Sequence, residues 1–542
     1  MNRSLFMKLV GAVALALAVA TPALAAPWKF GVMSDTQWRQ PNTTVYPYTV
    51  AVGIIDQLNA EFVRHGVEFV VQTGDLTDNG SSAAMQMRAD AAKALYDAGI
   101  GFYPLRGNHE SSQAAALQFQ GLYPQTQGAG PNVAGATAFS SPFATLKGLS
   151  YSFDVHGARF VLLDQFTRTD GTSYLGSSND NVLDQLPWIT ATLDAKAADQ
   201  HAFVFAHKGL ITENHVDTLF GANPAANPDA QDAFIGELQK AGVRYLFGGH
   251  DHMHNRALVA SPDAEASVQD ITTASNSYKF YIPQTGANVN DVRYDVPAFG
   301  FARETELAQE LFTVGYYIVT VDGPRVTVDY WASPNGCSGD CDLTETPALA
   351  FTRRETFGYS LNGKEFLVPQ AASYTAVDDS FQGTAAKILD GTNGSATSDW
   401  AGRPLAHAVD TGWTPRACGT ASAALTLWGM SSMVPGLAAN ETDAYVLSMS
   451  YDRSLGHWRY GTGRFGIQAR DDQGRWVPAT DLTGGETRSV VGPWAPGYGL
   501  GTYGVDPETG TAWAVVDYQG EFRVANFDDA VTDAVCALEG KR

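Results

Sequence analysis

The chain has 542 residues, more than a single hydrophobic core usually serves, so its length predicts at least two domains. Its formal net charge is −22, with 57 acidic residues against 35 lysines and arginines. Long nucleic acids are bound by clustered lysine and arginine, and the sequence contains no basic run. The composition therefore argues against a partner of that class.

The first 25 residues have the pattern of a secretory leader. Arg3 and Lys8 form a basic head, an apolar run follows over 9–20, and Ala23-Leu24-Ala25 is typical of a cleavage site. The apolar run is too short for a permanent membrane helix. We expect cleavage after Ala25 and an exported protein, periplasmic or secreted, with no membrane span in its mature form. The alternative is an uncleaved membrane anchor.

Strand and helix patterns alternate after the leader. Residues 28–34 have a strand pattern, 49–65 carry apolar side chains at helical spacing, and 67–71 form the next strand. A second helix at about 82–98 leads to a strand at 101–105. This alternation is typical of a layered α/β core in which helices cover a sheet.

Hairpins join this alternation further along the chain. One is expected from 150–155 and 159–163, and another from 314–321 and 325–331. Between them lie two helix–strand pairs, predicted at about 183–196 with 202–205 and at about 229–241 with 243–247. Hairpins combined with strand–helix units predict two packed mixed sheets flanked by helices.

The composition changes near residue 336. Residues 336–404 are rich in Cys, Gly and Thr, include a hairpin signal at Leu361-Asn362-Gly363-Lys364, and are expected to form a hairpin and linker region. Residues 405–542 contain alternating runs separated by turns, which predicts a smaller β-rich C-terminal domain. Several tryptophans there could form a sugar-binding face, although core packing is the simpler use.

Four cysteines, all beyond residue 336, predict disulfides in an exported protein. Three pairings are possible, and we favour Cys337 with Cys341 and Cys418 with Cys536. A cysteine metal site is the competing interpretation, and the absence of a Cys-x-x-Cys spacing argues against it.

Five short polar segments each follow an apolar run. They are Ser34-Asp35-Thr36-Gln37, Gly74-Asp75-Leu76-Thr77-Asp78, Gly107-Asn108-His109-Glu110, Ala206-His207 and Gly248-Gly249-His250-Asp251-His252. Asp, Asn and His supply the oxygen and imidazole donors that suit Mn, Fe, Zn or Ni. In this order, the segments make residues 26–335 resemble the calcineurin-like metallophosphoesterases. The resemblance implies a four-layer α/β/β/α sandwich.

The resemblance also implies a centre of two divalent metal ions, such as Mn, Fe or Zn. The implied ligands are Asp35 and His252 for the first ion, Asn108, His207 and His250 for the second, and Asp75 as a bridge between them. With only two carboxylates among these ligands, the centre keeps a net charge of about +2, which attracts a phosphate dianion.

His109 follows the ligand Asn108 and stays unligated in the family pattern. It would protonate or hydrogen-bond the leaving oxygen, and the adjacent Glu110 could orient its imidazole. Asp78 is expected to fix its loop, and His215 is a candidate substrate contact.

We therefore expect an exported metal-dependent hydrolase of small or medium phosphate esters that uses a metal-activated water. The alternatives are a phosphodiesterase rather than a monoesterase, or a degenerate cell-surface binding protein that retains one metal. The contacts that distinguish mono- from diesters come from loops, and the candidates are 111–149 and 265–310.

Gln37 departs from the family pattern, which usually has His two residues after the first Asp. An amide oxygen is a weaker donor than imidazole and favours harder ions. Gln37 could be a ligand of a more oxophilic first metal, or a water could replace it. In the third alternative the first site is weak and the protein is degenerate.

Overall fold

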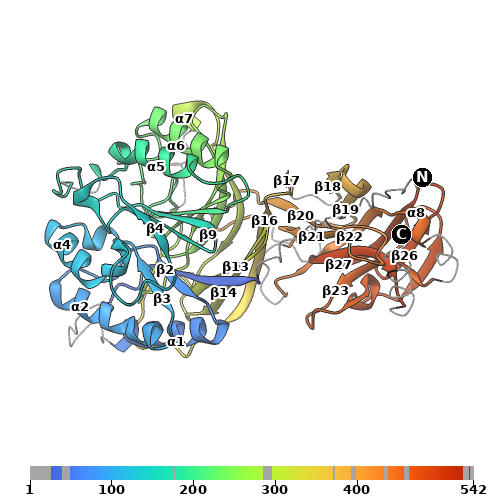
Figure 1. The fold of residues 1–542 in the computed structure, drawn as a ribbon, viewed down its shortest axis with the longest axis horizontal. Coiled ribbons are helices and arrows are strands. Elements are labelled where there is room, and N and C mark those ends of the chain that lie inside the picture. The colour runs from blue at the N-terminus through green and yellow to red at the C-terminus, as the bar shows by residue number, and fades with distance from the viewer. Residues whose placement is uncertain are drawn as a thin grey trace, which may run out of the picture.

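The computed structural model describes residues 26–38, 49–174, 179–284, 296–369, 373–391, 398–431, 438–456, 463–528 and 536. The expected leader, at 1–25, lies outside them. Within these ranges no helix combines the length and the hydropathy needed to cross a membrane. Figure 1 shows a larger part that carries helices on its outside and a smaller part made of strands.

The first sheet has six strands in the order β16-β14-β13-β1-β2-β3. They are β1 (Trp28–Met33), β2 (Phe69–Gln72), β3 (Gly101–Pro104), β13 (Thr313–Asp322), β14 (Arg325–Pro334) and β16 (Thr352–Ser360). β1, β2 and β3 run parallel, whereas β13 pairs antiparallel with β1. The parallel strands are short apolar runs because both of their faces are covered.

The second sheet has eight strands in the order β12-β9-β10-β8-β7-β6-β5-β4. They are β4 (Thr137–Ser140), β5 (Tyr151–Val155), β6 (Ala158–Leu162), β7 (Ala202–Phe205), β8 (Tyr245–Gly248), β9 (His254–Ala260), β10 (Ser267–Thr272) and β12 (Glu304–Glu310). β6, β7, β8 and β10 run parallel.

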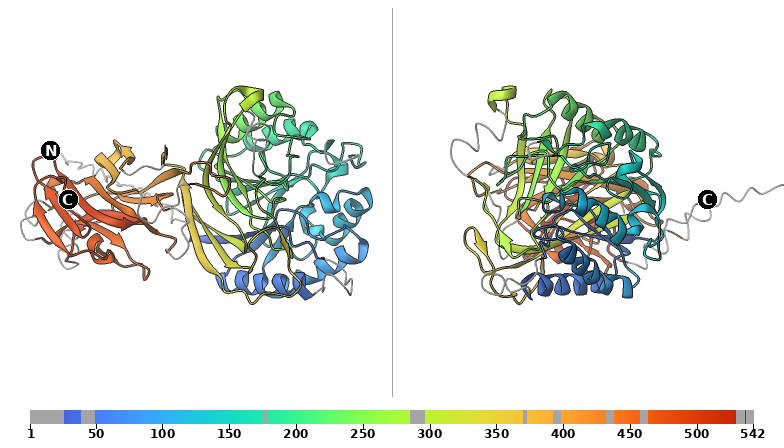
Figure 2. Two further views of the ribbon diagram at one scale, coloured as in Figure 1. Left: turned by 180° about the vertical axis from the view of Figure 1, so that it is seen from behind. Right: turned by 90° about the vertical axis from the view of Figure 1, so that its left-hand side faces the viewer.

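The two sheets pack face to face, with helices on their outer faces. Aromatic side chains fill the space between the sheets, and the Phe30 ring of β1 lies 5.0 Å from the Phe203 ring of β7. The larger helices are α1 (Thr49–His65), α2 (Ser82–Ala91), α4 (Gln113–Leu122), α5 (Leu186–Asp194) and α6 (Pro228–Lys240). In Figures 1 and 2 one group of helices flanks each sheet, which confirms the predicted four-layer sandwich.

Apolar stripes fix the helices on the sheets. Leu58 and Phe62 of α1 pack in one core with Val70 of β2, whereas Phe234 of α6 packs with Val204 of β7. The helix expected at about 82–98 is instead two helices, because α2 ends before Ala92 and α3 (Lys93–Asp97) begins after it. No Gly or Pro marks this break in the sequence. A short helix, α7 (Val296–Phe299), follows later.

The C-terminal region contains two six-stranded sheets around a separate core, which confirms the predicted β-rich unit. The first has the order β17-β20-β21-β28-β23-β24: β17 (Glu365–Pro369), β20 (Ala406–Thr414), β21 (Ala424–Trp428), β28 (Glu521–Asn526), β23 (Phe465–Arg470) and β24 (Trp476–Pro478). The second has the order β18-β19-β22-β27-β26-β25: β18 (Thr375–Asp379), β19 (Thr384–Ile388), β22 (Glu441–Ser450), β27 (Thr511–Tyr518), β26 (Thr502–Asp506) and β25 (Arg488–Val491).

The expected linker region at 336–404 contributes strands to both parts. β16 extends the first sheet, whereas β17, β18 and β19 belong to the C-terminal sheets. We therefore propose that the boundary between the two domains falls between β16 and β17.

Trp413, Trp428 and Trp513 are buried, in agreement with core packing. A short helix, α8 (Arg453–Gly456), completes this part.

Both favoured disulfides are present, Cys337 with Cys341 and Cys418 with Cys536. The first lies beside the small sheet formed by β11 (Lys279–Phe280) and β15 (Cys341–Asp342). That sheet pairs residues 279–280, which follow β10, with residues 341–342, which follow β14.

Candidate metal centre

The polar segments lie at the carboxyl ends of parallel strands from both sheets. Asp35, Asp75 and Asn108 follow β1, β2 and β3, and His207 and His250 follow β7 and β8. Carboxyl ends of parallel strands meet at one edge of a sheet, where loops can bring their side chains together. The packing of the two sheets joins the two sets of loops.

Five residues in these loops have an unusual backbone conformation. Asp35, Gln37, Asp75, His250 and His252 all have positive φ, between 37° and 75°. Non-glycine residues rarely adopt this conformation, which costs free energy and concentrates at functional sites. Three of these five residues, Asp35, Asp75 and His252, bring their side chains close together.

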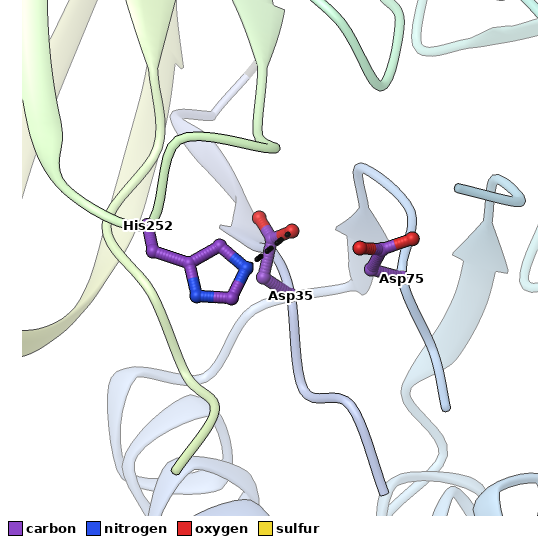
Figure 3. A group of neighbouring side chains, drawn as sticks. All are labelled: Asp35, Asp75 and His252. Carbon is purple, nitrogen blue, oxygen red and sulfur yellow. Dashed lines mark ion pairs between the residues drawn. The ribbon is translucent and has the colours of Figure 1, made fainter. Parts of the chain in front are cut away.

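Asp35, Asp75 and His252 converge from three loops, as Figure 3 shows. One donor atom from each lies within 4.8 Å of the others, and His252 Nε2 is 3.5 Å from Asp35 Oδ1. His207 approaches Asp75 from the second sheet, with its Nε2 3.4 Å from Asp75 Oδ1 and 2.9 Å from Asn108 Oδ1. The carboxylate of Asp75 thus lies between the two groups of side chains.

Backbone carbonyls fix the orientation of two imidazoles. His207 Nδ1 lies 3.0 Å from the carbonyl oxygen of Thr73, and His252 Nδ1 lies 2.9 Å from that of Lys279. A carbonyl only accepts hydrogen bonds, so Nδ1 carries the proton and Nε2 presents a lone pair to the carboxylates. Metal-ligating histidines are held in this way, and the buried oxygen and nitrogen donors fit divalent ions.

Burial keeps the imidazoles neutral. It lowers the pKa of His250 and of His252 to about 3, and it lowers the pKa of His207. Burial and the charge of Asp75 raise the pKa of Asp35 well above its ordinary value. Burial also acts on Asp75, but His207, His109 and His250 outweigh it and hold the pKa of Asp75 below its ordinary value. Neutral imidazoles are the form that binds metal.

His109 lies at the edge of the centre with its side chain 24% exposed. Its Nδ1 is 2.5 Å from the carbonyl oxygen of Asp78, and its Nε2 is 3.6 Å from Asp75 Oδ2. Burial opposes protonation, but Asp75 and the Asp78 carbonyl outweigh it and raise the pKa of His109. Solvent can therefore reach an imidazole that remains beside the Asp75 carboxylate.

Glu110 does not make the contact expected of it. Its buried carboxylate accepts hydrogen bonds from the amides of Leu76, Thr77 and Gly107 and from the Thr77 hydroxyl. The neighbouring side chains point apart, so the Asp78 carbonyl, not Glu110, orients His109. Glu110 instead fixes the loop that carries Asp75. Burial and the charge of Asp75 raise the pKa of Glu110 to about 7.

Gln37 is buried at the same centre. Its Oε1 accepts a hydrogen bond from Ser277 Oγ at 2.8 Å, and its Nε2 lies 3.1 Å from Asp75 Oδ2. Asp78, expected to fix its loop, accepts hydrogen bonds from the Lys279 ammonium and the Tyr278 hydroxyl. These contacts attach the Asp75 loop to the segment that contains β11.

Sequence reasoning missed the residues that surround the His250 imidazole. Asp217 Oδ1 lies 3.4 Å from His250 Nε2, and Asp251 accepts from both the backbone amide and Nδ1 of His215. The His215 ring stacks on His250 with centroids 3.9 Å apart, and its expected contact with substrate stays a prediction. Asp251 lies inside a polar segment and could have been found there. Asp217 and Ser277 lie outside all five segments.

Comparison with known proteins agrees with this geometry. Residues 29–254 match the sequence model of the calcineurin-like phosphoesterases. These residues form a calcineurin-like phosphoesterase domain. The match confirms the predicted enzyme class, a phosphoric ester hydrolase, and the two divalent metal ions that the family uses. No curated protein matches the chain.

Some solved structures are similar to part of this chain at low sequence identity. A dimetal phosphatase from Danio rerio is 16% identical, covers 58% of this chain and 98% of its own, and has a TM-score of 0.34. Purple acid phosphatase PPD1 from yellow lupin is 11% identical, covers 62% and 54%, and has a TM-score of 0.38. GAP50, the anchor in the inner membrane complex of Plasmodium, is 11% identical, covers 60% and 91%, and has a TM-score of 0.33.

Proposed function

We propose that this chain is an exported hydrolase of small or medium phosphate esters with a dinuclear metal centre. The observation that carries the proposal is the convergence of buried carboxylates with imidazoles whose lone pairs face them. Without bound cations, two carboxylates in so buried a space are costly.

The proposed ligands are six residues from the five polar segments. Asp35 and His252 hold the first ion, Asn108, His207 and His250 hold the second, and Asp75 bridges both. When bound, such ions acidify a water and neutralise phosphoryl oxygens. Gln37, also predicted as a ligand, is treated separately below.

His109 is proposed to deliver a proton to the leaving oxygen. The Asp78 carbonyl holds Nδ1, which leaves Nε2 as the atom available for proton transfer. Asp75 favours the protonated imidazole, which is the form a general acid needs. Glu110 contributes by fixing the loop of Asp75 rather than by proton transfer.

Export is supported by the leader pattern and by two disulfides, which form in oxidising compartments. The acidic surface, with a net charge of −22, disfavours long nucleic acid as a substrate and leaves small phosphate esters.

The proposal is tested by measuring metal content and hydrolysis on the same purified sample. Protein stripped and then reconstituted with Mn²⁺ or Zn²⁺ is assayed with nitrophenyl phosphate and bis(nitrophenyl) phosphate. We expect turnover of at least one ester to rise with metal content, and the preferred ester identifies a monoesterase or a diesterase. One ion or none, with no turnover after reconstitution, would favour the cell-surface binding protein instead.

A further inference from the structure

Gln37 is held in one orientation by Ser277. The Ser277 hydroxyl accepts a hydrogen bond from the Lys279 amide at 3.0 Å. Its own proton is therefore available for Gln37 Oε1, 2.8 Å away. The backbone amide of Gln37 donates to the Asp75 carbonyl at 2.9 Å, which fixes the start of the side chain. The amide oxygen of Gln37 is thus hydrogen-bonded to Ser277.

The amide nitrogen faces the metal centre. Gln37 Nε2 lies 3.1 Å from Asp75 Oδ2, 3.2 Å from His252 Nε2 and 3.3 Å from His109 Nε2. His252 has Nδ1 beside the Lys279 carbonyl, so its neutral ring presents a lone pair at Nε2 and accepts a hydrogen bond there. The two N–H bonds of an NH₂ group suit the Asp75 carboxylate and His252 Nε2, whereas an oxygen there would meet the lone pairs of both.

We infer that Gln37 does not act as a ligand of the first metal but directs its NH₂ group at that site. This inference rests on the proposed function. Among the residues that the structure describes, the first ion then has Asp35, Asp75 and His252 as donors, while the second keeps four donors. The two sites therefore differ in affinity: the second binds an ion tightly and the first binds one weakly and exchangeably.

Gln37→Met separates a ligand from a hydrogen-bond donor, because methionine has a similar length and neither an amide oxygen nor an NH₂ group. We expect Mn²⁺ titrated into stripped wild-type protein to bind in a tight step and a weak step. In Gln37→Met the weak step should be unchanged or tighter. In Gln37→His, which adds an imidazole donor, it should tighten by about tenfold or more.

Ser277→Ala provides a second test at a residue outside the proposed ligands. Without the hydroxyl, the amide can turn and present its oxygen to the ion, so the weak step should tighten. If the oxygen were already a ligand, with the NH₂ group bonded to Ser277, the same substitution would remove support and weaken binding. The two possibilities thus predict opposite signs.

Isothermal titration calorimetry with Mn²⁺ decides whether Gln37 is a ligand of the first metal. Asn108→Ala serves as the control that should lose the tight step and keep the weak one. A weak step that loosens about tenfold in Gln37→Met, or that loosens in Ser277→Ala, would overturn the inference and leave the proposed function intact. No binding by either wild type or Gln37→His would overturn the proposed function together with the inference.

Discussion

At the residue scale, a backbone carbonyl sets the tautomer of three imidazoles in the centre. The carbonyls of Thr73, Asp78 and Lys279 each lie beside an Nδ1 atom. His207 and His252 are buried, whereas His109 is partly exposed. The same arrangement therefore supports our proposal that His207 and His252 are metal donors and that His109 carries a proton.

His109→Ala should lower turnover by about 10²–10⁴-fold and leave metal content unchanged, because the imidazole acts on the leaving group rather than on the ions. The loss should be smaller for nitrophenyl phosphate than for an alkyl phosphate, whose leaving group needs the proton more. His156→Ala, at an exposed hairpin, is the matched control. Equal losses for both esters would argue against proton donation.

The metal-free protein should lose stability in acid. Burial lowers the pKa of His250 and His252 to about 3, against about 6.5 for free imidazole, so the folded state binds fewer protons. The stability contributed by these groups is present above about pH 6.5 and is lost as the pH falls toward 3.

Thermal unfolding of the stripped protein checks this dependence at pH 7.5 and pH 5. His252→Gln removes one titrating group, so its unfolding temperature should fall less between the two values. A drop as large as that of wild type would show that His252 does not contribute.

At the scale of elements, the turn after β3 needs glycine for the Asp75 loop to approach. A Cβ atom at Gly107 would lie 1.9 Å from Asp75 Oδ1. We expect Gly107→Ala to displace Asp75 and to lower both metal content and turnover. Gly121→Ala is the control, since a Cβ atom there meets nothing within 4 Å. Normal metal content in Gly107→Ala, measured after dialysis, would contradict the close approach.

Elements whose cause is local were predictable from the sequence. The strand expected at 202–205 coincides with β7, and the polar segments after β1, β2 and β8 lie at one centre. β12 was missed because its partner β9 is distant in the sequence. β9 and β10 pair with each other across residues 261–266 and were also missed, and β10 and β12 fall within 265–310, which was expected to be a loop. Asp217 and Ser277 escaped notice because each reaches the site from a loop with no motif of its own.

At the scale of the whole molecule, a buried charge cluster connects the two parts of the chain. Arg403, in the segment that precedes β20, pairs with four buried carboxylates at 2.6–2.7 Å: Glu213, Glu304, Glu306 and Asp399. The amide of Glu213 donates to Asp251, which also bonds to His215 beside His250. The proposed domain junction and the proposed metal centre therefore share a loop.

Arg403→Leu should destabilise the protein by about 3–5 kcal/mol, because it leaves buried carboxylates without their cation. Arg475→Ala, at an exposed ion pair with Asp471, should cost no more than about 1 kcal/mol. Denaturant unfolding of both variants measures the difference. A loss for Arg403→Leu as small as that of the control would show that protonation already neutralises the cluster.

The central claim is that Asp75 bridges two ions that perform the hydrolysis. Asp75→Asn keeps the shape of the side chain but removes the charge shared between the ions. Metal content and ester turnover should be measured on one sample of this variant, beside Asp97→Asn at an exposed ion pair. We predict that Asp75→Asn loses at least one bound ion and its turnover, while its thermal unfolding and the control remain normal. Full turnover with undiminished metal content in Asp75→Asn would contradict the dinuclear account.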